Sequence, residues 1–265
     1  MNTALSVAGS DSCAGAGIQA DLKTFHAHGV YGLTAITAVT VQNTQKVSAV
    51  QEMDPEIVRD QMLCLFEDIE IQAVKVGMVF NVSIIEAIAR AFEAVKPSRV
   101  VIDPVMISKS GYALLQEEAQ EALIKRLLPL AHVLTPNLME AGTILGRDIQ
   151  GVKAMKEAAR AICDLGPASV VLKGGHLDRD KATDVFYDGQ EVFELPGTFT
   201  QTTSTHGTGC TFSSAIAANL ALGRSLPEAV HQAKAYISEA IAQGLSIGQG
   251  HGPTHHFYAM KMVEG

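Results

Sequence analysis

The segment HGTGCTFS, residues 206–213, holds the residues best suited to chemistry, because it stands directly before an apolar stretch with helical spacing. Gly207, Thr208 and Gly209 let the backbone turn with several N–H groups pointing outward, and a helix start adds partial positive charge. Such a loop can hold a phosphoryl group. Cys210 would lie at the same positive end, where the pKa of a thiol is lowered, so it is a candidate base or nucleophile. The alternative is a buried structural cysteine behind an ordinary glycine turn.

Two acidic residues could hold Mg²⁺ near that loop. Asp103 follows a predicted strand, and Glu140 lies three residues after Asn137, one helical turn along the same face. A hard cation takes one or two carboxylates together with phosphate oxygens and waters. Each acid also has a structural alternative, with Asp103 capping a turn and the Asn-x-x-Glu pattern forming a capping box at a helix start.

The segment GSDSCAGAGIQAD, residues 9–21, also follows a predicted strand and opens a helix. Gly15, Gly17 and Ala20 match a weak form of the dinucleotide fingerprint, but no acidic residue lies between 22 and 51 to take the ribose hydroxyls. A nicotinamide oxidoreductase is therefore a remote alternative, and no P-loop is present. In the tail HGPTHH, residues 251–256, Gly and Pro break the spacing that would align histidines on a metal, so we expect a loop.

The elements that must position these residues alternate along the chain. We expect short β-branched strands over 4–8, 33–41, 73–76, 99–102, 132–134 and 169–172, and a hairpin of 184–187 with 192–195 joined by Asp188-Gly189 near a sheet edge. We expect helices over 18–27, 55–68, 82–94, 117–128, 138–145, 152–164, 209–222 and 226–245. This alternation predicts an α/β fold whose parallel sheet is covered by helices on both faces. Ligands of such folds bind beyond the carboxyl ends of the strands, where small, polar and acidic residues collect in this sequence.

Composition narrows the classes of function. The chain has 265 residues, 47% hydrophobic and 18% charged, which allows a large core, and we expect one domain over 1–265. A formal charge of −8 gives no overall attraction for nucleic acid or an anionic membrane surface. The four cysteines form no CxxC pair, which is typical of a cytoplasmic protein, and no apolar run predicts a membrane span.

A set of motifs resembles a known family over nearly the whole chain. The motifs are AGSDSCAGAGIQADLKTF (8–25), VQNT (41–44), KVGM (75–78), DPVM (103–106), TPNLMEA (135–141), KGGH (173–176), HGTGCTFS (206–213) and GPTHHF (252–257). Their combination is similar to the bacterial hydroxymethylpyrimidine/phosphomethylpyrimidine kinases of thiamine biosynthesis, in the ribokinase-like superfamily. The resemblance implies a three-layer α/β/α fold with a mostly parallel sheet and a homodimer. It also implies ATP- and Mg²⁺-dependent phosphorylation of 4-amino-5-hydroxymethyl-2-methylpyrimidine and then of its monophosphate.

The resemblance also implies roles for individual residues. Gln42 would hydrogen-bond the aminopyrimidine, with Asp21, Gly9 and Met78 near it. Gly207, Thr208 and Gly209 would form the anion hole, and Cys210 would replace the aspartate base of other ribokinase-like enzymes. The nucleotide and metal region would be lined by Lys173, Thr135, Asn137, Glu140, Asp103 near the phosphates, and Lys109 in a segment that can close over the site. The first substrate loop departs from the family, because Ser12-Cys13-Ala14 replaces a Pro-Ser-Gly-like stretch.

Two further alternatives remain beside the oxidoreductase. A pyridoxal or pyridoxine kinase would use the same Cys210 loop, and Gln42 and Met78 would shape its pocket for a different ring. A non-enzymatic pyrimidine-binding protein would keep the pocket without turnover.

Overall fold

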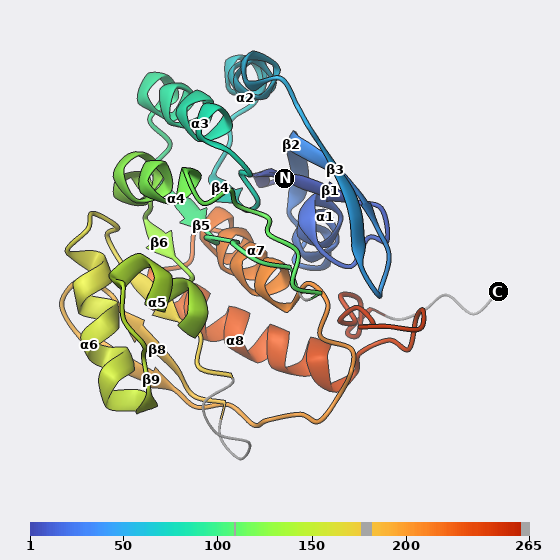
Figure 1. Cartoon of the computed structure of the whole chain (residues 1–265), viewed down its shortest axis with the longest axis vertical. Coiled ribbons are helices and arrows are strands. Elements are labelled where there is room, and N and C mark those ends of the chain that lie inside the picture. Colours follow the sequence, from blue (N-terminus) through green and yellow to red (C-terminus); the bar gives the residue numbers. More distant parts are fainter. Residues whose placement is uncertain (109, 176–181, 261–265) are drawn as a thin grey trace.

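A computed structural model describes residues 1–108, 110–175 and 182–260 (Figure 1). Within them lies a nine-stranded sheet of order β3-β2-β1-β4-β5-β6-β7-β8-β9. The pairs from β2 through β7 are parallel, whereas β3, β8 and β9 run antiparallel to their neighbours. The strands are β1 (Thr3–Asp11), β2 (Tyr31–Gln42), β3 (Val47–Glu52), β4 (Ala73–Val76), β5 (Val100–Ile102), β6 (Val133–Leu134), β7 (Val170–Leu172), β8 (Asp184–Tyr187) and β9 (Val192–Leu195).

Helices cover both faces of this sheet, which gives the expected three layers of helices, sheet and helices. Helices α1 (Gly17–Ala27), α7 (Thr208–Ala221) and α8 (Leu226–Ala242) pack on one face. The other face carries α2 (Pro55–Asp68), α3 (Val82–Val95), α4 (Ala119–Ala122), α5 (Leu138–Leu145) and α6 (Gly151–Cys163), with a π-helix (Leu123–Leu127) and a 3₁₀ helix (Leu128–Leu130) after α4. The expected mostly parallel sheet with an edge hairpin is confirmed.

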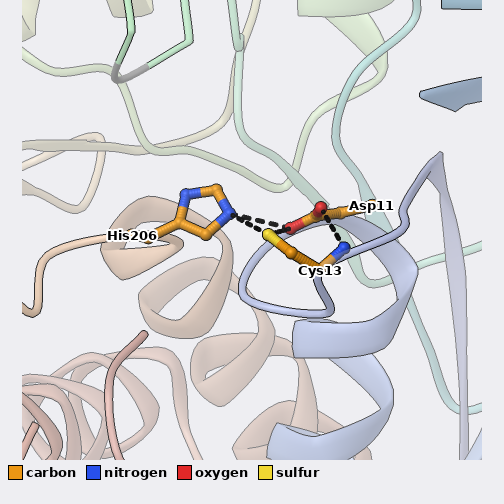
Figure 2. A group of neighbouring side chains, drawn as sticks. All are labelled: Asp11, Cys13 and His206. Carbon is orange, nitrogen blue, oxygen red and sulfur yellow. Dashed lines mark hydrogen bonds and ion pairs between the residues drawn. The ribbon is translucent and has the colours of Figure 1, made fainter. Parts of the chain in front are cut away.

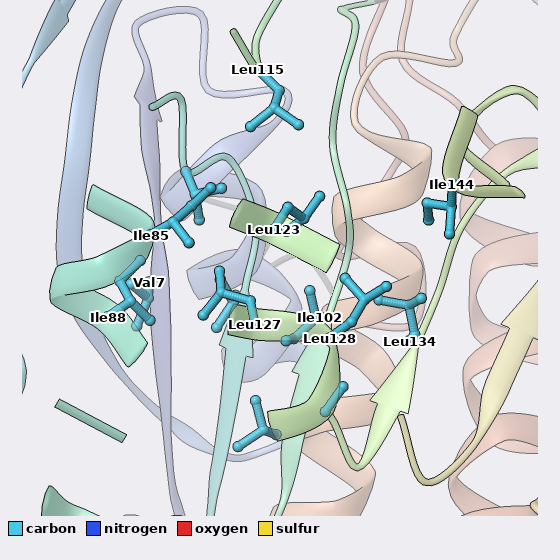
Figure 3. Packing of buried hydrophobic residues seen from close by; sticks show 14 of the residues in the cluster. Val7, Ile85, Ile88, Ile102, Leu115, Leu123, Leu127, Leu128, Leu134 and Ile144 are labelled. Carbon is cyan, nitrogen blue, oxygen red and sulfur yellow. The ribbon is translucent and has the colours of Figure 1, made fainter. Parts of the chain in front are cut away.

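Each central strand contributes to two hydrophobic cores, because successive side chains of a strand point to opposite faces. In β5, Val100 and Ile102 join the core under α2 to α6, while Val101 joins the core under α1, α7 and α8. Figure 3 shows the first core, where Ile85 and Ile88 of α3 and Leu127 of the π-helix meet the sheet. This burial on both faces explains why the central strands read as continuous apolar runs.

Several predicted elements match the structure residue for residue, namely 55–68, 73–76, 138–145, 184–187 and 192–195. One prediction was wrong, and one strand was missed. The stretch 117–128 is not one helix but a single turn of α-helix that continues as a π-helix and then a 3₁₀ helix at Pro129. The sequence reading also missed β3, an edge strand with most residues exposed or half-buried.

The fold brings the polar segments to one edge of the sheet, because parallel strands end on the same side. Asp103 follows β5, Thr135 follows β6 and Lys173 follows β7, and the start of α7 lies against them. The tail that holds residues 251–256 is a loop that pairs with His206 through Pro253, as expected. Across the described parts of the chain, no helix is both long enough and apolar enough to cross a membrane.

Candidate functional site

The loop before α7 has a backbone that only glycine accommodates well. Gly207 is the N-cap of α7 and has a φ of 76°, in the left-handed region. A Cβ at this position would overlap the carbonyl of Gly15, so the β1–α1 loop and the α7 loop meet backbone to backbone. The α7 loop therefore places the amides of Thr208 and Gly209 at a helix start, the geometry that binds anions, with the Thr208 amide making a long hydrogen bond of 3.5 Å to the Thr205 carbonyl.

A lysine and a carboxylate face this helix start. Lys173 Nζ lies 2.8 Å from Asp103 Oδ1, and a Cβ added at Gly209 would lie 3.2 Å from Asp103 Oδ2 and 3.4 Å from Lys173 Nζ. The hydroxyl of Thr135, which is fully buried, also donates to Asp103 Oδ1 at 3.3 Å. Among the residues that the structure describes, Asp103 Oδ2 accepts no hydrogen bond. One carboxylate oxygen is thus available at the anion loop, as a Mg²⁺ ligand must be.

Glu140 lies at the start of α5 and forms the capping box with Asn137. Glu140 Oε2 accepts from the Asn137 amide at 2.7 Å, and Asn137 Oδ1 accepts from the Glu140 amide at 2.9 Å. Burial raises the pKa of the Glu140 carboxyl to about 7, and the charge of Asp103 adds to this, while Lys173 opposes it. A carboxyl that is half protonated near neutral pH beside another carboxylate would be ionised by a nearby cation.

Cys210 occupies the first turn of α7, half-buried next to a buried ion pair. Lys75 Nζ donates to both oxygens of Asp21 at 2.9 and 2.8 Å, and both side chains are fully buried. The hydroxyls of Ser6 and Ser214 donate to the same carboxylate at 2.5 and 2.6 Å. Asp21 therefore has both oxygens occupied, and its predicted contact with a pyrimidine stays a prediction.

The expected lowering of the Cys210 pKa is not what the structure gives. Burial raises the pKa of this thiol to about 11, the carboxylates of Asp21 and Asp103 add to it, and Lys75 opposes it. The helix start alone cannot overcome the loss of water around a thiolate. Cys210 is a neutral thiol at pH 7, and the prediction of an accessible thiolate was wrong for the protein without ligands.

The predicted substrate residues fall into two groups. Gly9 and Met78 are adjacent, because a Cβ on Gly9 would lie 2.9 Å from the Met78 sulfur. Gln42 lies instead beside His206, with its Nε2 position 3.3 Å from His206 Nε2 and its Oε1 position 3.1 Å from the Thr40 hydroxyl.

A further cluster of side chains at this edge joins three residues, two of which lie far from the third in the sequence. Figure 2 shows Asp11, at the end of β1, and Cys13, in the loop that follows, pointing at His206. Asp11 Oδ2 lies 2.8 Å from His206 Nε2, and Cys13 Sγ lies 3.4 Å from Asp11 Oδ2 and 3.5 Å from His206 Nε2. Although burial opposes ionisation, hydrogen bonds from His206 and Cys13 lower the pKa of Asp11 to about 2. Burial and Asp11 raise the pKa of Cys13 to about 11.

Sequence reasoning missed this trio as a unit, as well as the role of Lys75. The one available signal for Lys75 was its position inside the apolar strand AVKV, where a charge needs a partner. Two predicted residues cannot be placed, because Lys109 and His176 of KGGH lie outside the described residues.

Comparisons with known proteins identify the family to which the chain belongs. A family model described as Phosphomethylpyrimidine kinase matches residues 11–255. A Rhizobium meliloti protein named hydroxymethylpyrimidine/phosphomethylpyrimidine kinase is 54% identical over 258 residues, which cover 96% of this chain and 97% of the relative. This chain belongs to the phosphomethylpyrimidine kinase family. As a member of that family it is a phosphotransferase.

Solved structures extend the comparison of this phosphomethylpyrimidine kinase family member. The crystal structure of an ADP complex of Bacillus subtilis pyridoxal kinase is 43% identical, has a TM-score of 0.90 and covers 97% of each chain. A phosphomethylpyrimidine kinase from Clostridium difficile is 47% identical, has a TM-score of 0.82 and covers 91% of this chain and all of its own. The fold is therefore shared by relatives that carry either kinase name.

Proposed function

We propose that this phosphotransferase uses ATP and Mg²⁺ to phosphorylate 4-amino-5-hydroxymethyl-2-methylpyrimidine and then its monophosphate. The observation that carries the proposal is the start of α7, where outward amides, a thiol, a lysine and a free carboxylate oxygen meet at one sheet edge. Phosphoryl transfer requires positioning and charge stabilisation more than covalent chemistry, and this set of groups provides both.

The transferred phosphoryl group would lie on the amides of Gly207, Thr208 and Gly209. These donors are fixed before the substrate arrives, because Gly207 is locked against the Gly15 backbone. Fixed donors need no reorganisation as charge develops on the equatorial oxygens. Lys173 would add a positive charge, and its pKa is raised because Asp103 and Glu140 outweigh the effect of burial, so it stays protonated.

Mg²⁺ would be held through Asp103 Oδ2 and Glu140, with waters and phosphate oxygens completing the shell. The ion, when bound, neutralises charge on the phosphates. Thr135 and Lys173 orient Asp103 by bonding its other oxygen. Asn137 holds Glu140 through the capping box. Lys109 belongs to this nucleotide region by the resemblance alone.

Cys210 would accept the proton of the substrate hydroxyl. A thiol that is protonated in the resting protein must first lose its own proton to act as a base, so the transfer depends on the small thiolate fraction. Lys75, held by Asp21, is the cation that favours this thiolate. Asp21 and Lys75 are thus positioning residues for Cys210.

Gln42 would recognise the aminopyrimidine edge, since a side-chain amide offers both a donor and an acceptor. Gly9 and Met78 would contact the ring. Gln42→Ala should raise the KM for the pyrimidine alcohol with a smaller effect on kcat. An unchanged KM would remove Gln42 from the pocket.

A coupled assay tests the proposal. ADP release is measured with ATP and Mg²⁺ and each of three acceptors: the pyrimidine alcohol, its monophosphate and pyridoxal. We expect turnover of both pyrimidines with a higher kcat/KM than for pyridoxal. Absence of turnover with either pyrimidine, while the protein is folded and binds ATP, contradicts the proposal and favours a non-enzymatic binding protein.

Pyridoxal kinase is the second candidate, favoured by the Bacillus subtilis structure at 43% identity. Both acceptors present a hydroxymethyl group on a heteroaromatic ring, so the anion loop would serve either one. A kcat/KM for pyridoxal above that for the pyrimidine alcohol would establish this alternative.

We also propose that the protein works in the cytoplasm as a homodimer. The exposed side chains of Tyr31, Val39 and Val41 on β2 support an interface, and four free cysteines fit a reducing compartment. Sedimentation of the full chain tests the dimer.

A further inference from the structure

The trio of Asp11, Cys13 and His206 has a geometry that a simple loop contact does not require. We propose that it is a binding site for a borderline-soft divalent cation of the Zn²⁺ type, with the amide oxygen of Gln42 as the fourth ligand. This site is separate from the magnesium region, where the ligands are oxygens only.

The chemistry of the donors selects the class of metal. A thiolate, an imidazole nitrogen and a carboxylate are the ligands that Zn²⁺ takes, whereas Mg²⁺ prefers oxygen alone. The ligand atoms of the three side chains lie within 4.8 Å of one another. Asp11 and His206 are buried and Cys13 is half-buried, so water competes little for the ion.

The distances between donor atoms approach those of a tetrahedral site. With ordinary Zn–S, Zn–N and Zn–O bond lengths, neighbouring donors are about 3.3–3.6 Å apart. Cys13 Sγ is 3.5 Å from His206 Nε2 and 3.4 Å from Asp11 Oδ2, so only the 2.8 Å hydrogen bond between His206 and Asp11 must lengthen. The amides of Gly15 and Ala16 donate to Asp11 Oδ2 at 3.0 and 2.8 Å, which fixes the carboxylate as second-shell partners fix metal ligands.

The hydrogen-bond network turns the oxygen of Gln42 toward the trio. His206 must donate from Nε2, because its partner Asp11 Oδ2 can only accept. An amide nitrogen of Gln42 placed 3.3 Å from that N–H would set donor against donor. The single hydroxyl proton of Thr40 faces a second conflict, since it would have to reach both the Ser10 carbonyl at 3.0 Å and Gln42 Oε1.

Exchanging the amide oxygen and nitrogen of Gln42 resolves both conflicts at once. The amide nitrogen then donates to the Thr40 hydroxyl, which donates to Ser10, and the amide oxygen rather than the nitrogen faces His206 Nε2, whose proton is donated to Asp11. The oxygen of Gln42 thereby lies at the site, 3.3 Å from the nitrogen that a cation would bind.

Binding of the cation balances as a proton exchange without any redox change. Sγ–H of Cys13 breaks and its proton goes to solvent, while a metal–sulfur bond forms. In the metal-free protein the proton on His206 Nε2 is donated to Asp11; when the cation binds, this proton leaves to solvent and Nδ1 takes one from solvent, which frees the Nε2 lone pair for the metal. Because Gln42 is the proposed pyrimidine-recognising residue, the cation and the pyrimidine compete for it; this consequence rests on the proposed function.

Cobalt spectroscopy on the full chain tests the metal site without any measurement of activity. The protein is treated with a chelator, desalted and titrated with Co²⁺ alone, and Zn²⁺ is then added to displace it. We expect one equivalent of Co²⁺ with a thiolate charge-transfer band and the strong visible bands of a tetrahedral ion. The absence of a charge-transfer band in the wild-type protein overturns the site, whatever the variants do.

The matched variants are Cys13→Ser and Cys64→Ser, the second being exposed on α2. Cys13→Ser should abolish the charge-transfer band and weaken Zn²⁺ binding at least about 100-fold, beyond the loss typical of second-shell changes. Cys64→Ser should leave both unchanged. A band that persists in Cys13→Ser, with folding checked by circular dichroism, assigns the metal elsewhere and overturns the proposal.

Competition separates this inference from the proposed function. Saturating pyrimidine alcohol, without ATP, should weaken Co²⁺ binding at least tenfold. If Co²⁺ binds through Cys13 equally well with and without the pyrimidine, the shared use of Gln42 is refuted while kinase turnover is untouched. If neither pyrimidine is turned over with ATP and Mg²⁺ in buffer free of Co²⁺ and Zn²⁺, but the band appears in the titration, the proposed function fails and the metal site stands.

Discussion

Replacing Cys210 tests the chemistry of the site most directly. Burial raises the pKa of this thiol from 9.0 to about 11, so at pH 7.5 only about 3 in 10,000 molecules carry the thiolate. If the thiolate accepts the substrate proton, kcat/KM should rise about tenfold for each pH unit between 7 and 9. Lys173, whose pKa is raised, keeps its charge over this range and adds no competing titration.

Two substitutions of Cys210 set the size of the expected kinetic effects. Cys210→Ala removes the base and should lower kcat at least about a hundredfold with little change in pyrimidine affinity, because the lost group acts on the proton. Cys210→Asp introduces a carboxylate that is ionised at neutral pH, so its kcat/KM should vary little between pH 7 and 9. The acidic neighbours Asp21 and Asp103 would raise the pKa of the new carboxyl, yet Lys75 and Lys173 lie beside them.

Two measurements check the argument. Steady-state kinetics at saturating ATP and Mg²⁺ give the pH profiles. The thiolate absorbance in the ultraviolet, taken as the difference between wild type and Cys210→Ser, gives the midpoint of the titration directly. The reasoning is refuted if the wild-type profile is flat from pH 7 to 9, or if Cys210→Ala keeps wild-type turnover.

Three further predictions concern the support of the site. Gly207→Ala forces a Cβ into the Gly15 carbonyl. The displaced loop should lower kcat/KM about 10²–10³-fold, as loss of one anion-hole donor does. Steady-state kinetics on the folded variant measure this loss, and a wild-type kcat/KM would contradict the prediction. Lys75→Met leaves the buried Asp21 carboxylate without its cation and should cost about 3–5 kcal/mol in urea unfolding, with part of the loss restored by adding Asp21→Asn. Burial lowers the pKa of His256 to about 4, so the unfolded chain binds this proton first as pH falls, and this histidine should cost about 3 kcal/mol of stability from pH 6.5 to 4. The raised pKa of Glu140 acts in the opposite direction over this range, so the contribution of His256 is measured as the difference between wild type and His256→Gln in urea titrations at several pH values, and equal slopes would contradict it.

Local signals explain which elements could be predicted. The helix Pro55–Asp68 was predicted because Asp54 caps it and Pro55 occupies its first turn, and Asp54 does accept from the amides of Glu56 and Ile57. The hairpin of β8 and β9 was predicted because Asp188-Gly189 is a turn sequence that joins two strands. Strand β3 carries no such signal, since it forms by pairing with β2, and the π-helix Leu123–Leu127 depends on packing in the core rather than on its own sequence.

The site residues also differ in whether a local sequence signal predicts them. The segment after each strand could be read from the sequence, because parallel strands end together, so Asp103 and Lys173 could be expected at one edge. The ion pair of Lys75 with Asp21 joins residues 54 positions apart, and the contact of Asp11 with His206 spans 195 positions. No local sequence pattern predicts contacts between residues so far apart along the chain. The pKa of Cys210 was misjudged for the same reason, since its burial and its acidic neighbours come from other segments.

The arrangement around Cys210 also suggests why a thiol can serve where a carboxylate would be the simpler base. Each nearby lysine is paired with a carboxylate, Lys75 with Asp21 and Lys173 with Asp103, so the charge of Lys75 offsets only part of the burial and acidic charge that raise the pKa of the Cys210 thiol. A permanent anion at the start of α7 would repel the incoming phosphates. If ATP binds on the amides as proposed, a neutral thiol would not repel its phosphates. On the proposed function, the raised pKa of Cys210 would favour nucleotide binding at the expense of the thiolate fraction, so Cys210→Asp should bind ATP more weakly than wild type even where its turnover is independent of pH.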